Sequence, residues 1–228
     1  WELGMRAEFL DNRWRVNFTY FDNDYDDLQL GGSTARGFVR FNVPKVATNG
    51  FELESVFQAT ENLWFDGYIA YLDGEYKEVN QDAVEAIAGT GPNPKCGGEI
   101  PDAECVLNNF ELKNAPEWNY MIAGNYMTGF SNGGEMVFRV SVSYEDESYN
   151  LVGNPEAIKR DETTMVDGRI AYTGASDTWS VGLWGKNLTD EVYYPAATTV
   201  GAAGMGIPGL AFPGQPRTYG VDFRYTFK

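Results

Sequence analysis

The chain has 228 residues with 33 Asp or Glu against 17 Lys or Arg, and its formal net charge of −16 argues against a nucleic-acid partner, which would require a cationic surplus. It contains no His, which excludes Ser-His-Asp and Cys-His catalysis and every imidazole metal site, so we expect no catalytic residues and no cofactor. No run of eighteen apolar residues occurs, so no transmembrane helix is expected, although 15% of the residues are aromatic.

From the N-terminus onward, apolar and polar residues alternate with a period of two, which is typical of β-strands. In one segment, Phe138, Val140 and Val142 fall on one face, whereas Arg139 and Ser141 fall on the other. The pattern predicts nine strands, at residues 1–9, 14–20, 50–60, 63–76, 117–129, 135–144, 163–174, 178–189 and 218–227.

The length of these segments favours a membrane-spanning barrel over a soluble sandwich. Most are close to ten residues long or longer, whereas strands in globular proteins usually have about 5–6 residues. Aromatic residues lie near the segment ends, as Trp118 and Tyr126 do, and such girdles are typical of transmembrane barrels. The opposite faces carry charged residues, which suits a wet or plugged lumen better than a dry core.

The connections between the predicted strands alternate between short and long. Short ones lie near 10–12, 60–62, 131–134 and 174–177, and long ones lie at about 24–48, 78–115, 146–162 and 190–216. Outer-membrane barrels have short periplasmic turns and long extracellular loops. The alternation therefore predicts that the last strand descends and leaves Lys228 in the periplasm.

Two segments near the end of the chain, WSVGLWGKNLTDEVYY at 179–194 and PGQPRTYGVDFRYTF at 213–227, resemble the closing region of TonB-dependent receptors. Segments 18–30, 50–54 and 114–120 also resemble strands of that family. Lys228 departs from the pattern, because such barrels commonly end in the aromatic residue itself. The matching positions are Asn187, Leu188, Thr189, Asp190, Tyr193, Pro216, Arg217 and Phe227.

The resemblance implies an all-β fold, a transmembrane antiparallel β-barrel, of which residues 1–228 form the C-terminal part. In such receptors 22 strands surround a plug, and nine strands cannot close a barrel of that size, so we expect the plug and the earlier strands to lie outside these residues. The implied partners are outer-membrane lipid and lipopolysaccharide, a small-molecule ligand, and a TonB-type energy-coupling complex that acts on the plug.

The two cysteines, Cys96 and Cys105, lie in the segment CGGEIPDAEC. With no His and no second cysteine pair, a disulfide formed in an oxidising compartment is favoured over a zinc site. We therefore expect this disulfide at the tip of an extracellular loop.

Asp22, Asp24 and Asp26 alternate in an extended segment, so their carboxylates project from one side and could bind Ca²⁺. The segment lacks the glycine and the distal glutamate of a dedicated Ca²⁺ loop, and we favour a solvated strand end. Asn187 and Asp190 are expected to organise a strand end through bonds to nearby backbone, and Arg217 to pair with a lumen acid.

Ligand contacts are expected from the long loops, and the candidates are Tyr149, Met205 and Phe212. The resemblance implies energy-coupled import of a scarce ligand such as a ferric siderophore or another nutrient, whose identity the sequence does not specify. The alternatives are a passive outer-membrane porin, an outer-membrane enzyme, which the absence of His disfavours, and a soluble sandwich that binds sugar.

Overall fold

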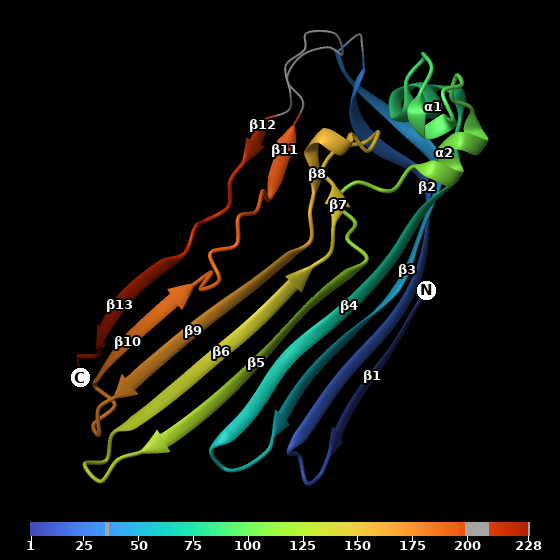
Figure 1. Cartoon of the computed structure of the whole chain (residues 1–228). Helices are drawn as coiled ribbons and strands as arrows, with labels where there is room; N and C mark the ends of the chain where they lie inside the picture. Colours follow the sequence, from blue (N-terminus) through green and yellow to red (C-terminus); the bar gives the residue numbers. More distant parts are fainter. Residues whose placement is uncertain (35–36, 199–209, 228) are drawn as a thin grey trace.

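Nine strands form one antiparallel sheet in which neighbours in space follow each other along the chain (Figure 1). The computed structural model describes residues 1–34, 37–198 and 210–227. In sheet order the strands are β1 (Glu2–Phe9), β2 (Trp14–Thr34), β3 (Gly37–Gln58), β4 (Leu63–Glu78), β5 (Trp118–Gly129), β6 (Glu135–Glu145), β9 (Thr163–Thr173), β10 (Trp179–Lys186) and β13 (Thr218–Tyr225). The nine strands expected from the periodicity are all present.

The sheet is open, with β1 at one edge and β13 at the other (Figure 1). The two edge strands do not pair with each other, and in the described residues each has one neighbour in the sheet. The pairing of their outer edges with further strands of a receptor stays a prediction.

The register places paired residues on the same face, and the two faces differ in chemistry. Phe138 of β6 pairs with Ile170 of β9, and both belong to what we call the apolar face. Arg139 pairs with Asn125 of β5, and both belong to the opposite, polar face. On the apolar face Val140 is 55% exposed, so this face is not covered by a second layer.

Aromatic rings form two rows on the apolar face. Toward the long connections the row includes Phe51, Tyr71 and Trp118, whose neighbouring ring centroids are 5.9 and 4.8 Å apart. Toward the short turns it includes Trp14 and Phe57, 6.4 Å apart. Phe51 and Phe57 are separated by about 20 Å of strand at roughly 3.3 Å per residue. Two aromatic rows at opposite ends of an apolar face are typical of the girdles of a transmembrane barrel.

The described residues of the stretch 24–48, which is expected to be a loop, instead form the extended end of the β2–β3 hairpin. Asp27 takes a φ of +54° and Pro44 has no N–H, and both are left out of the pairing register. On either side the ladder continues, and Phe41 and Val43 become buried. The irregular pair interrupts the sequence pattern but does not end the strands.

The other long connections contain short elements at the same end of the sheet. They are α1 (Gln81–Ala88), η1 (Pro94–Cys96), α2 (Ala103–Asn109), β7 (Ser148–Tyr149), η2 (Glu156–Ile158), β8 (Lys159–Arg160), β11 (Ala196–Thr198) and β12 (Leu210–Phe212). Asn80 and Asp102 cap the two α-helices, since their side chains accept hydrogen bonds from Ala83 N and Cys105 N, both at 2.8 Å. No helix among the described residues is long and apolar enough to cross a membrane.

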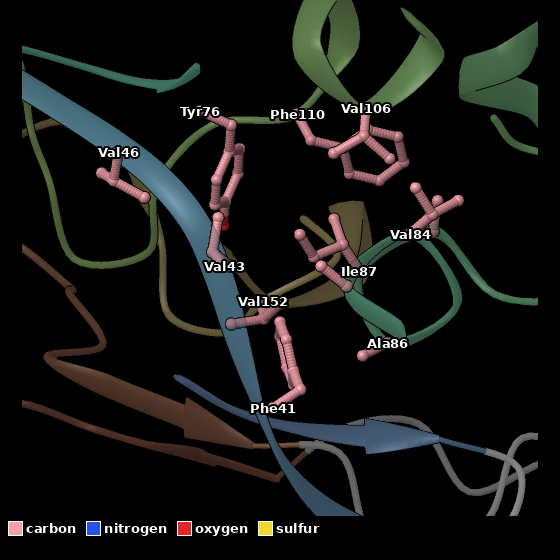
Figure 2. Close-up of a cluster of buried hydrophobic side chains, with 12 residues drawn as sticks. Phe41, Val43, Val46, Tyr76, Val84, Ala86, Ile87, Val106, Phe110 and Val152 are labelled. Atoms are coloured by element: carbon pink, nitrogen blue, oxygen red, sulfur yellow. The ribbon is translucent and has the colours of Figure 1, made fainter. Parts of the chain in front are cut away.

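The main buried cluster lies among these connections and not between layers of the sheet. Figure 2 shows Phe41 and Val43 of β3 beside Val84 and Ile87 of α1, with Val106 of α2 close by. In Figure 1 the two helices lie against the upper end of β2 and β3. The opposite end of the sheet has only the short turns 10–13, 59–62, 130–134 and 174–178.

Candidate functional site

A hydrogen-bonded ion pair crosses three strands on the polar face. The two terminal nitrogens of Arg139 lie 2.7 and 2.9 Å from the two carboxylate oxygens of Asp66. Asn125 on the strand between them donates to Asp66 at 2.7 Å and accepts from Arg139 at 2.8 Å. The two-pronged geometry satisfies both charged groups on a face where Asn125 is only 4% exposed.

A second ion pair joins Arg169 of β9 to Asp222 of β13, with N–O distances of 2.6 and 2.8 Å. It passes over Gly182 of β10, where an added Cβ would collide with the Arg169 guanidinium. A glycine at 182 therefore lets the pair span the strand between its partners. The sequence periodicity places Arg169 and Asp222 on the polar face, but only the register brings them together.

The polar face is hollowed near β1, β2 and β3, and the hollow has a volume of about 760 Å³. Its lining includes Arg6, Arg15, Asn17, Glu54 and Tyr68. Asn17 donates to Glu54 at 3.2 Å. Arg6 and Arg15 make no ion pair within residues 1–34, 37–198 and 210–227, so this part of the wall carries charges that are free to meet another surface.

Tyr149, a candidate ligand contact, is buried and holds two loops together. Its hydroxyl donates to Glu156 at 2.6 Å and accepts from Lys95 at 3.3 Å. The amino groups of Lys95 and Lys159 lie 4.8 and 5.4 Å from its ring centre. Burial and the hydrogen bond to Glu156 raise the pKa of Tyr149 to about 12, and the same bond, followed by Lys95, lowers the pKa of Glu156. This environment disfavours direct ligand contact by the ring.

The other two loop candidates have different settings. Phe212 is 55% exposed on β12, opposite Ala196 of β11, so its side chain is free to contact another molecule. Met205 lies outside the described residues.

The three aspartates of the DNDYDD segment lie on β2. Asp24 has its carboxylate 3.7 Å from the Lys45 amino group, and both side chains are well exposed. Within the part of the chain that the structure describes, no group of three or more His, Cys, Asp or Glu side chains is arranged to hold a metal ion. Asp24 is thus a solvated residue within β2 and does not lie at the strand end expected from the sequence.

Cys96 and Cys105 are joined by a disulfide, with Cα atoms 5.5 Å apart. The bond connects η1 to the first turn of α2, which lie in the long connection between β4 and β5. This arrangement agrees with the pairing expected from the sequence.

The NLTD motif forms a turn and not the end of a strand, so the expected strand 178–189 stops at Lys186. Asn187 takes a φ of +50°, and its amide side chain bonds to the backbone of Glu191 and Gln215. Leu188 packs over Gly168 and Gly185, whereas Thr189 is exposed.

The PR motif completes the same turn. Arg217 bonds through its backbone N–H and its guanidinium to the Asp190 carboxylate, at 3.1 and 3.3 Å, so its partner is an acid of the motif at the strand end and not the expected acid of the lumen wall. Pro216 is exposed beside it, and the Tyr193 ring lies against Gly214. Phe227 lies beyond β13, 86% exposed, with its ring 4.8 Å from that of Tyr225.

Several residues that shape the polar face and the loops were not singled out from the sequence. The alternation within the predicted strands places Asp66, Asn125 and Arg169 on the polar face. Their hydrogen-bond partners depend on the register between strands, which the alternation does not give. Asn154 carries the signal of an Asn after Gly, a combination that often adopts a left-handed turn, and its φ is +46°.

The family model described as TonB dependent receptor-like, beta-barrel, matches residues 1–188. The ferric-pyoverdine M114 receptor PbuA of Pseudomonas sp. (strain M114) is 28% identical over 233 residues, covering 100% of this chain and 24% of the relative. The chain thus spans about a quarter of that protein's length.

Two solved structures share the fold at low sequence identity. The ferric yersiniabactin uptake receptor FyuA from Yersinia pestis aligns with a TM-score of 0.71 and 17% identity, covering 100% of this chain and 29% of that one. The siderophore receptor PiuA from Acinetobacter baumannii aligns with a TM-score of 0.67 and 18% identity, covering 97% and 27%.

The open sheet thus matches part of a receptor barrel. Proteins of this family reside in the bacterial outer membrane, and they are transporters and not enzymes. The chain belongs to the TonB-dependent receptor family and forms part of its β-barrel.

Proposed function

We propose that the intact receptor imports a scarce small-molecule ligand, such as a ferric siderophore or another nutrient, with energy from a TonB-type complex. The observation that supports this most directly is the division of the sheet into two faces. An exposed apolar face with two aromatic rows suits lipid, and a polar face whose charges are paired across strands suits a hydrated lumen.

The polar face also suits contact with a plug that lies in a part of the receptor outside this chain. Arg6 and Arg15 at the hollow are available for ion pairs or hydrogen bonds with such a domain. A plug blocks passive flow, so passage of the ligand has to wait for work on the plug by the inner-membrane complex. Import that waits for such work differs from diffusion through a passive porin.

The proposed orientation follows from the two ends of the sheet. The long connections with their folded elements face the cell exterior, where the ligand arrives and lipopolysaccharide surrounds the barrel. The short turns face the periplasm, and β13 runs toward them, so the C-terminal end of the chain lies on the periplasmic side. Phe212 and Met205 stay proposed ligand contacts in the last long connection, whereas Tyr149 is proposed to act through loop structure.

The names of the relatives favour a ferric siderophore as ligand, since PbuA is described as a ferric-pyoverdine receptor and FyuA as a ferric yersiniabactin uptake receptor. The test is uptake of radioactive iron carried by a panel of siderophores that includes pyoverdine. Cells that carry the full receptor are compared with cells that carry none, each with and without a protonophore.

The proposal predicts that the protonophore abolishes uptake while binding at the cell surface remains. Uptake that continues in its presence would support a porin. Conversion of the ligand by the purified receptor would support an enzyme.

A further inference from the structure

Three connections that are far apart in sequence share one buried core at the long-loop end of the sheet. We call the unit the cap, and it consists of residues 28–34 and 37–46 of the β2–β3 hairpin, the connection 79–117 and the connection 146–162. Each contributes to the core, to which Tyr76 of β4 also belongs (Figure 2). The other members are Phe41, Val43, Val46, Ala83, Val84, Ala86, Ile87, Ala88, Val106, Phe110 and Val152. Val43 of the hairpin and Val106 of the 79–117 connection are both fully buried. No single connection therefore forms this core alone.

Asn154 joins the third connection to the second. Its side chain accepts a hydrogen bond from Glu111 N at 2.7 Å and donates to Glu111 O at 3.0 Å, so it pairs with a backbone as a strand residue would. Asn154 is 1% exposed, and removing its side chain would take away both hydrogen bonds to the Glu111 backbone. Next to it, Gly153 has a φ of +90° and lies so close to Ile87 O that a Cβ would approach to 2.7 Å.

The disulfide closes the second connection beside the same core. Cys96 is bonded to Cys105 of α2, and the preceding Lys95 extends to the third connection, with its amino group 3.1 Å from Glu156. The backbone N–H of Asn114 also donates to Tyr149 O at 2.8 Å. The second and third connections are thus joined at several separate points.

We propose that the cap is one cooperative unit, in which the three connections open and close together and Asn154 and the disulfide act as its two locks. Segments that share a core and a network of buried hydrogen bonds open as a unit because separating one exposes the others. The last connection is held through Asn187, Asp190 and Arg217 at the ends of β10 and β13, and its strand β11 also lies against β8 of the third connection. If the proposed receptor function holds, an incoming ligand meets a preformed wall on the cap side, and loop-by-loop closure is confined to other connections.

The test uses hydrogen exchange of the full receptor in lipid nanodiscs without any ligand, so its result does not depend on the import function. Asn154→Gly is the informative variant, because glycine accepts the positive φ and only the side-chain bonds are lost. The expected result is a rise of about tenfold or more in the exchange rates of α1, α2 and the 146–162 connection together. The matched control is Asn150→Ala, which removes an amide nitrogen of the same connection that makes no hydrogen bond, and it should leave all three unchanged.

A second variant removes the disulfide of the cap. Cys96→Ser combined with Cys105→Ser should raise exchange in the 146–162 connection as well as in α2, although both cysteines lie in the 79–117 connection. Unchanged exchange of the β6 amides shows in each case that the barrel itself is folded. Faster exchange confined to the connection that carries the substitution, or no change in either variant, would overturn the proposal.

Discussion

Val140 and Ser141 are adjacent in β6 and point to opposite faces, so they provide the sharpest comparison at the scale of single residues. Val140 is 55% exposed on the apolar face, opposite Gly124 and Gly168, and Ser141 lies on the polar face opposite Ala123 and Asp167. A side chain that meets hydrocarbon loses hydration, whereas one that meets a hydrated lumen keeps it.

We predict that Val140→Arg lowers the free energy of unfolding by about 2–4 kcal/mol, whereas Ser141→Arg lowers it far less. The measurement is denaturant unfolding of the full receptor in lipid vesicles. Equal losses for the two variants would mean that the faces are assigned wrongly.

The Asp66–Asn125–Arg139 network allows a second prediction about single residues. Arg139→Met leaves the Asp66 carboxylate beside Asn125 without its cation. The Asp66 side chain is 26% exposed and the Arg139 side chain is 36% exposed. We therefore expect the free energy of unfolding to fall by about 1–3 kcal/mol, between the values for surface and fully buried ion pairs. Adding Asp66→Asn removes the unpaired charge and should restore part of the stability, as a double-mutant cycle measures.

Arg224 of β13 provides the matched control for this cycle. It is an exposed arginine on the same polar face as Arg139, and it makes no ion pair in the described part of the chain. Arg224→Met should change stability by less than about 0.5 kcal/mol. A loss at Arg224 equal to that at Arg139 would show that cation removal alone, and not the unpaired carboxylate, causes the effect.

At the scale of elements, the clamp around Tyr149 predicts a dependence on alkaline pH. Because the folded pKa of Tyr149 is raised to about 12, the neutral phenol stabilises the folded loops below its ordinary pKa near 10. This contribution is lost as the pH rises through about 12. The clamp between the loops 79–117 and 146–162 is therefore expected to weaken only in strong alkali.

The check is a difference titration of phenolate absorbance between the native receptor and Tyr149→Phe. We expect the missing component to have a midpoint near pH 12, and Glu156→Gln to move that midpoint toward 10, because the Glu156 bond is one cause of the shift. A midpoint near 10 in the native receptor would contradict the clamp.

The strands could be predicted from the sequence because each face of the sheet has a single environment, which imposes a clear period of two. The extension of the β2–β3 hairpin could not, because Asp27 and Pro44 interrupt the pattern at a point where the ladder resumes. The helices α1 and α2 have only eight and seven residues, too short for a clear helical period.

The residues of the candidate site likewise include some that could be predicted from the sequence and some that could not. The alternation of apolar and polar residues predicts that Arg139 and Asp222 lie on the polar face. It does not predict that they pair with Asp66 and Arg169, because pairing across strands depends on register. Tyr149 lies in a long loop, and long loops often carry function, so the sequence predicts a ligand contact there. The hydrogen bonds of its hydroxyl group with Lys95 and Glu156 could not be predicted, because the contact between the two loops is not encoded in any local pattern.

At the scale of the whole molecule, the open edges of β1 and β13 and the division into two faces describe one section of a barrel wall. An unpaired strand edge in lipid leaves backbone groups unsatisfied at a cost of several kcal/mol each, so both edges are expected to be paired in the full receptor. The ion pairs of the polar face and the aromatic rows of the apolar face then define the inside and the outside of that wall.

The measurement that tests this account most directly is a nitroxide scan along β6 of the full receptor in lipid vesicles. Labels are placed singly at positions 138 to 143, and their collisions with oxygen, which concentrates in lipid, and with a water-soluble nickel chelate are compared. The account predicts a period of two, with oxygen collisions highest at 138, 140 and 142 and nickel collisions highest at 139, 141 and 143. A scan without alternation, or with the two sets exchanged, would contradict it.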